Sequence, residues 1–207
     1  LAYDWLHDFP GVDEALRARA RQRFDAWTQW YIQNGYRPRS PGTNYNAGYV
    51  FAATLIAIAQ YGEAGKAGER LWSHVVDELI GKDLLPAMTG DGVLVGGDWG
   101  EGWQYAPLSI AEYALSLRAV APYGVDGGRA QPWLSDVLTR HVFAMVPGPG
   151  AQTHAVGDTQ AEGPYLDVRA ETLAAVLVGP ADQKTKRHAE SEMRRLRLYD
   201  EPQGFPL

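Results

Sequence analysis

The chain has 207 residues, 45% of them hydrophobic, and a formal net charge of −6 at pH 7. That length suits one domain with a sizeable core, and the hydrophobic content excludes wholesale disorder. An acidic chain with no long basic stretch before its last predicted helix is a poor binder of nucleic acid. Cysteine is absent, which excludes disulfides and thiolate metal sites, and no apolar run reaches the roughly 18 residues of a membrane span. We expect a globular domain without a cofactor or a metal.

Hydrophobic periodicity predicts helix almost throughout the chain, in two alternating kinds. Residues Ala2–Leu6 are expected to be helical, without a capping residue before them. Two-faced helices, with one apolar and one polar side, are expected at residues 13–34, 67–80, 131–145 and 183–198. Helices that are apolar on nearly every side, and therefore buried, are expected at residues 46–61, 107–121 and 166–178.

Alternating outer and inner helices favour a double-layered all-α architecture, a partial (α/α)n toroid of helical hairpins. We assign residues 1–200 to this single domain and residues 201–207 to a tail or linker. The hairpins are too few for a closed ring, so the sequence reads as a piece of a longer polypeptide. An open ring would expose apolar inner helices, and self-association is one way to cover them.

Three long loops, at residues 35–43, 81–106 and 147–164, each lead from an outer helix to the start of an inner helix. In such a double layer these helix starts gather at one rim. Helix N-termini have free N–H groups and partial positive charge. The rim is therefore expected to favour anionic ligands, provided that acids in the loops do not cancel the field.

The second loop contains the most distinctive segment, Gly96–Tyr105, which has four glycines among its aromatic and acidic residues. Tryptophans beside carboxylates suit a site that stacks sugar rings and transfers protons. Catalytic residues also concentrate on loops held by a rigid scaffold. The candidate side chains are Asp98, Trp99, Glu101, Trp103 and Tyr105. The alternative is a turn-rich connector whose aromatic side chains only pack.

The first and third loops add further candidates. In the first, the amide of Asn44 is placed to donate to a substrate carboxylate, while Thr43 or Asn46 is expected to cap the next helix. In the third, His154 and Asp158 lie ahead of an apolar run, where Asp158 could equally belong to an ordinary turn and cap.

Four short elements occur in order along the chain: Tyr3-Asp4-Trp5-Leu6, Asn44-Tyr45, Glu101-Gly102-Trp103-Gln104-Tyr105 and Val156-Gly157-Asp158-Thr159. Together they resemble elements in the α/α-toroid domain of the heparinase II/III-like polysaccharide lyases and the related alginate lyases. The resemblance runs from Tyr3 to about Leu177. It implies a secreted or periplasmic protein that cleaves an acidic, uronate-containing polysaccharide by β-elimination.

The resemblance also implies roles for single residues. Tyr105 would be the catalytic tyrosine, and Asn44 would neutralise the uronate carboxylate. His154 is a candidate partner base that matches no family element. The candidate substrate-binding residues are Glu101, Trp99, Trp103, Asp98, Asp158 and Arg39. Such lyases usually continue into a β-sandwich that adds a catalytic histidine and often a metal site, and no part of this sequence reads as one.

Two other functions fit the same residues. A glycoside hydrolase on a similar toroid would use a carboxylate pair, with Glu101 as acid and Asp98 or Asp158 as base. A helical module without catalytic activity would bind glycans through Trp99 and Trp103. The sequence alone therefore leaves open whether the protein is an enzyme.

Overall fold

The computed structural model describes residues 2–63, 65–144, 152–154, 157–158, 165–166 and 183–195. This part of the chain is mostly helical, which confirms the predicted all-α class, and its two strands form one antiparallel pair of two residues each. The elements are α1 (Ala2–Trp5), α2 (Glu14–Asn34), α3 (Asn44–Gln60), α4 (Gly65–Ser73), η1 (His74–Leu84), α5 (Leu85–Ala87), α6 (Ala106–Val120), η2 (Ala121–Tyr123), η3 (Gly128–Ala130), α7 (Gln131–Ala144), β1 (Gln152–Thr153), β2 (Tyr165–Leu166) and α9 (Gln183–Arg195).

Most predicted helices appear close to their predicted bounds, and local capping explains where they begin. The carboxylate of Asp13 accepts the N–H of Leu16 at 2.7 Å, so α2 starts one residue later than predicted. The hydroxyl of Thr43 accepts the N–H of Asn46 at 3.2 Å, so α3 starts two residues earlier. The inner helix predicted at residues 166–178 lies outside the described residues, apart from Leu166 in β2.

The predicted loop at residues 81–106 is wrong in its first part, because residues 81–87 are helical. The helix that begins with α4 continues as η1, a π-helix, and then as α5. The N–H of Leu85 donates to the carbonyl of Ile80, five residues earlier, which is the π-helical spacing. Ile80 and Leu84 are fully buried, so packing carries the helix past Gly81, where the sequence suggested a stop.

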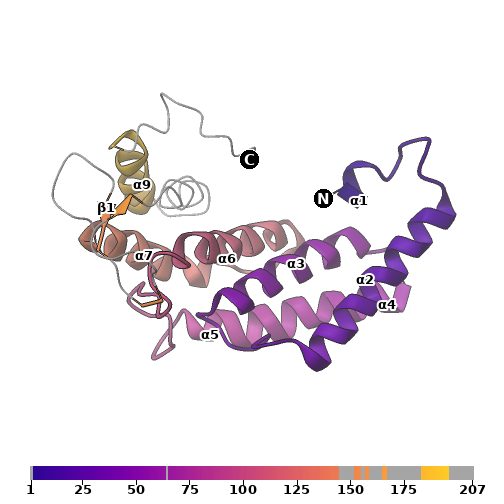
Figure 1. The fold of residues 1–207 in the computed structure, drawn as a ribbon, viewed down its shortest axis with the longest axis horizontal. Helices are drawn as coiled ribbons and strands as arrows, with labels where there is room; N and C mark the ends of the chain where they lie inside the picture. The colour runs from indigo at the N-terminus through magenta and orange to yellow at the C-terminus, as the bar shows by residue number, and fades with distance from the viewer. Residues whose placement is uncertain are drawn as a thin grey trace.

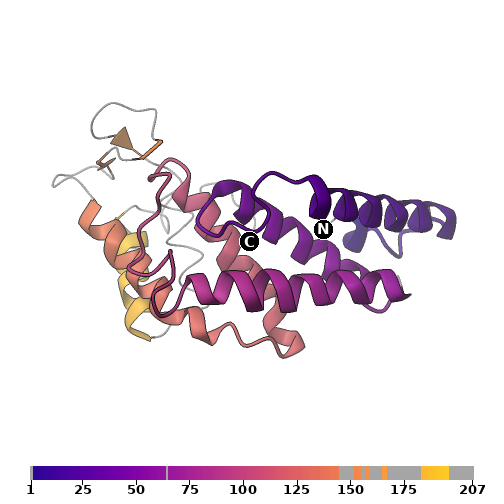
Figure 2. The ribbon, with the colours of Figure 1, turned by 90° about the horizontal axis from the view of Figure 1, so that it is seen from below.

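The inner position of α3 and α6 is clear in the packing. The two helices lie side by side, and α3 also contacts α2, α4 and η1 (Figures 1 and 2). Buried side chains from α3, η1, α6 and α7 form one hydrophobic core. At the other end of the molecule, α7 packs against α9 (Figure 1). The first two predicted loops thus lead into the starts of α3 and α6, the two inner helices that pack against each other.

The outer helix α2 is less buried than its sequence pattern predicts. Thr28 is its only fully buried residue, while Leu16 and Trp27, which we expected to face the core, are exposed. Tyr31 does face inward and stacks on Tyr49 of α3, with ring centroids 4.4 Å apart. The apolar face of α2 therefore packs against the core through only part of its length.

Candidate functional site

The loop before α6 is tied to the start of α3 through the carboxylate of Glu101. Its Oε2 accepts the backbone N–H of Asn44 at 2.8 Å and the indole N–H of Trp99 at 3.2 Å. Asn44 is the first residue of α3, so its N–H has no partner within the helix and Glu101 supplies one. Three of the predicted site residues therefore meet at this point.

The same contact changes the expected electrostatics of the rim. A carboxylate at a helix N-terminus offsets the partial positive charge there, typically by about 0.3–1 kcal/mol at an exposed site. At α3 this place is taken by Glu101 from the loop. The start of α3 therefore attracts an anionic ligand less strongly than the sequence suggested.

The third loop docks on the second at Gly157. The N–H of Asp158 donates to the carbonyl of Glu101 at 3.0 Å. Gly157 has a φ of +63°, and a Cβ on it would lie 2.6 Å from backbone atoms of Glu101 and Gly102, so only glycine allows this approach. The side chain of His154 is exposed, and no hydrogen bond joins it to Tyr105 within the part of the chain that the structure describes.

Asn44 and Asn46, which look alike in the sequence, differ in their surroundings. The amide of Asn46 is buried, donates to the carbonyl of Pro38 at 2.6 Å and accepts the hydroxyl of Tyr113 at 2.5 Å. The side chain of Asn44 is half-buried, and its amide forms no hydrogen bond within the described residues. Asn44 is thus available to a ligand. Tyr105, also half-buried, is the N-cap residue of α6.

The two tryptophans of the second loop are core residues. Trp99 is 3% exposed and Trp103 is 2% exposed, so neither offers a ring face to a sugar in this conformation. Asp98 lies 3.2 Å from the Nε of Arg140 on α7, and the Arg140 guanidinium also lies over the Trp103 ring. The loop is therefore anchored to α7 by packing and one ion pair, and its aromatic side chains hold the loop in place.

Arg39, a predicted substrate-binding residue, is held by acids of η1. It forms a two-bonded pair with Asp83, with one bond of 2.8 Å, and lies 3.3 Å from Glu78. In an α-helix with 3.6 residues per turn, residues five apart would point about 140° away from each other. The π-helical turn brings both acids to one arginine. Its guanidinium thus has partners on the protein already.

Sequence reasoning missed Glu112, which interrupts the apolar run of α6. Burial raises its pKa to about 7. Both carboxylate oxygens lie 3.9 Å from the position of a Cβ on Gly48, across the contact between α3 and α6. An acid within an otherwise apolar inner helix was the signal that could have found it.

A further pair of titratable groups lies between α3 and η1. The hydroxyl of Tyr49 is 2.9 Å from Nε2 of His74. Burial, and then the nearby Arg39, lowers the pKa of His74, while burial raises the pKa of Tyr49 well above its usual range. The pair is thus neutral at physiological pH and serves as a hydrogen-bonded part of the core.

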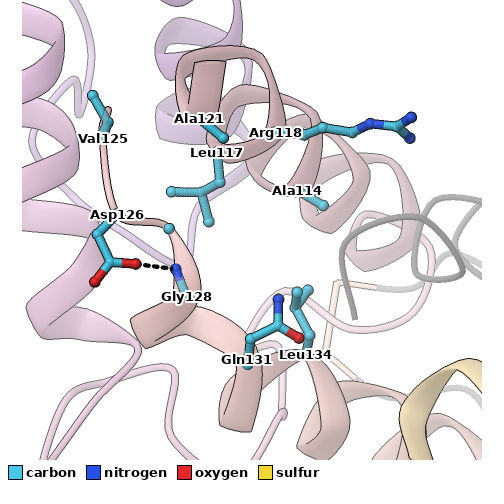
Figure 3. A pocket seen from close by; sticks show the side chains of 10 residues that line it. Ala114, Leu117, Arg118, Ala121, Val125, Asp126, Gly128, Gln131 and Leu134 are labelled. Carbon is cyan, nitrogen blue, oxygen red and sulfur yellow. Dashed lines mark hydrogen bonds between the residues drawn. The ribbon is translucent and has the colours of Figure 1, made fainter. Parts of the chain in front are cut away.

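A cavity of about 340 Å³ lies at the far end of α6, away from Tyr105. Leu117, Val125 and Leu134 line it, and the Asp126 carboxylate at its edge accepts the N–H of Gly128 at 2.9 Å (Figure 3). The guanidinium of Arg118 points away from Asp126 (Figure 3). The walls offer few converging polar groups, so this cavity is a weaker candidate than the rim.

No protein-family model, curated protein or solved structure matched this chain. In the described ranges, no group of three or more acidic or histidine side chains is placed to hold a metal ion. The helices found there are also too short or too polar to cross a bilayer.

Proposed function

We propose that this chain is the helical domain of a polysaccharide lyase-like protein that acts on uronate polymers by β-elimination. In this proposal α3 and α6 are inner helices of a partial α/α toroid, and α2 and the continuous helix of α4 and η1, which all contact α3, belong to its outer layer. The site is the rim where Asn44 and Tyr105 begin their inner helices. The protein would be secreted or periplasmic, with an acidic polysaccharide as its partner.

The chemistry needs two things at the reacting sugar. The uronate carboxylate has to be neutralised, so that charge developing beside it as the C5 proton leaves is stabilised, and the amide of Asn44 is suited to that. A base has to remove that proton, which is the role of Tyr105. The electrons then form the C4–C5 double bond, the C4–O bond breaks, and the leaving oxygen takes up a proton.

The observation that carries this proposal is the double hydrogen bond at Glu101. It joins the Asn44 element to the loop that ends at Tyr105, although Asn44 and Glu101 lie 57 residues apart in the chain. An oxygen that accepts two N–H groups is suited to position its neighbours rather than to donate a proton. The contact therefore favours the lyase over a hydrolase that uses Glu101 as its acid.

The test is turnover of uronate polymers such as alginate, hyaluronan and heparin, because elimination creates a conjugated double bond that absorbs in the ultraviolet. We expect Tyr105→Phe to lower kcat at least about 100-fold, in line with loss of a general base. Tyr123→Phe, which removes a hydroxyl beyond the other end of α6, is the matched control and should leave kcat unchanged.

Three results would refute the proposal. Full activity in Tyr105→Phe would exclude the tyrosine mechanism. Cleavage that yields only saturated ends, abolished by Glu101→Gln, would establish the hydrolase. Binding of the polymers without any cleavage would establish the module that only binds glycans.

A further inference from the structure

Two exposed tyrosines stand beside Asn44 at the rim. Tyr36, in the loop before α3, is 58% exposed, and Tyr45, in the first turn of α3, is 51% exposed. Their rings pack edge to face, with centroids 4.8 Å apart and planes at 83°. The open face of an aromatic ring is a surface on which a sugar ring can stack. With Trp99 and Trp103 buried, these tyrosines are the accessible aromatic surface next to Asn44.

Arg37 adds a positive charge to the tyrosine pair. Its guanidinium carbon lies 5.3 Å from the centre of the Tyr36 ring, within the range of a cation–π contact. Within the described ranges, no carboxylate forms an ion pair with Arg37. Arg39 and Arg140, by contrast, are paired with acids. Arg37 is therefore a cation near the start of α3 whose charge no carboxylate of the described residues offsets.

The backbone of Arg37 is also unusual. Its φ of +50° is the only positive value for a residue other than glycine in the described part of the chain. Such conformations are unfavourable for residues with a Cβ and concentrate at functional sites. A glycine would adopt this backbone without strain. The arginine side chain is therefore present at the cost of backbone strain in the loop.

We propose that Arg37, Tyr36 and Tyr45 form a subsite for an acidic sugar, next to the reacting position at Asn44 and Tyr105. The tyrosine rings carry a sugar ring by stacking, and the guanidinium binds the sugar carboxylate. Since Glu101 occupies the N-terminus of α3, Arg37 supplies the attraction for anions at this rim. The identity of the ligand, a uronate within an oligosaccharide, rests on the proposed function.

The test is calorimetric binding of tetrasaccharides from alginate, hyaluronan and heparin, each beside its carboxyl-reduced form. We expect the wild-type protein to prefer at least one native uronate probe over its reduced form. Arg37→Gly should weaken binding of that native probe about tenfold, the scale of one exposed charge-assisted hydrogen bond, and remove the preference. Arg23→Gln, which removes an exposed positive charge on α2, is the matched control and should change neither.

The stability of the same variants separates a lost contact from a damaged fold. Because glycine relieves the positive φ, Arg37→Gly should melt at or above the wild-type temperature even though it binds less tightly. Tyr45→Ala should weaken native and reduced probes alike, since stacking does not depend on the carboxylate. Unchanged binding of the native probe by Arg37→Gly would overturn the subsite, as would failure of the wild-type protein to bind any uronate probe.

Turnover in the same samples distinguishes failure of the subsite from failure of the proposed function. Tyr105→Phe should bind the native probe normally and not cleave it. If wild type binds with the expected preference but no uronate is ever eliminated, the function is wrong and the subsite stands. If uronates are eliminated and Arg37→Gly leaves both KM and affinity unchanged, the function stands and the subsite is wrong.

Discussion

Replacing Glu112 by glutamine should stabilise the protein at alkaline pH and leave it unchanged at acid pH. Burial raises the pKa of this carboxyl from 4.5 to about 7, so the folded state holds its proton more tightly than the unfolded chain does. Stability from this group is fully present below pH 4.5 and is lost as the pH rises to about 7 and beyond. Glutamine is neutral at every pH and removes that loss.

The size of the effect follows from the same values. A pKa difference of about 2.5 is equivalent to about 3.4 kcal/mol at about 1.36 kcal/mol per pH unit, if the site were dry. The Glu112 side chain is only partly buried, so solvent screening reduces this to about 1–2 kcal/mol. In a chain of this length that corresponds to a melting temperature about 2–8 °C higher for the variant at pH 8.

The measurement is urea unfolding of both proteins at intervals from pH 4.5 to 8.5. Other titrating groups, including His74, are common to both chains and cancel in the difference. We expect the two proteins to match near pH 4.5, to separate through pH 7, and then to differ by a constant amount. A difference that does not vary with pH would refute the reasoning, and so would a wild type more stable than Glu112→Gln at pH 8.

Two further substitutions test the contacts that hold the rim. Gly157→Ala should abolish docking of the third loop and speed hydrogen exchange at the amide of Asp158. The control is Gly90→Ala, at a similar positive φ but with open space around it, which should cause only backbone strain. Equal exchange at the Asp158 amide in both variants would contradict the close approach at Gly157. Tyr113→Phe removes the hydroxyl that donates to buried Asn46 and should lower the free energy of unfolding, measured by urea denaturation, by about 1–3 kcal/mol. A loss below about 0.5 kcal/mol would show that the Asn46 amide finds another hydrogen-bond partner.

The helices themselves were predictable, because their signals are local. Hydrophobic periodicity identified the buried helices α3 and α6 and placed the starts of α2 and α3 to within two residues, and in the structure Asp13 and Thr43 cap those starts. The prediction for the loop at residues 81–106 was wrong where a local signal, Gly81, was outweighed by burial of the residues around it. Whether a glycine ends a helix depends on what the next turn packs against.

The availability of each predicted site residue, by contrast, was decided by distant parts of the chain. Trp99 reads as an exposed stacking residue, but packing buries it. Arg39 reads as an anion ligand, but the π-helical turn of η1 brings two acids to it. Arg37, two residues earlier, forms no ion pair in the described ranges, and in the proposed subsite its guanidinium binds the sugar carboxylate.

The sequence by itself determined that this protein is a helical one, with polar loops that open buried helices, because helix period and caps are set by residues a few positions apart. Only the tertiary structure decided that Glu101 meets Asn44, that Glu112 faces Gly48, and that Arg39 pairs with acids while Arg37 forms no ion pair within the described ranges. Those outcomes depend on which helices lie side by side, and hence on residues that are distant in the chain, such as Asn44 and Glu101, which are 57 positions apart. No local pattern carries that information.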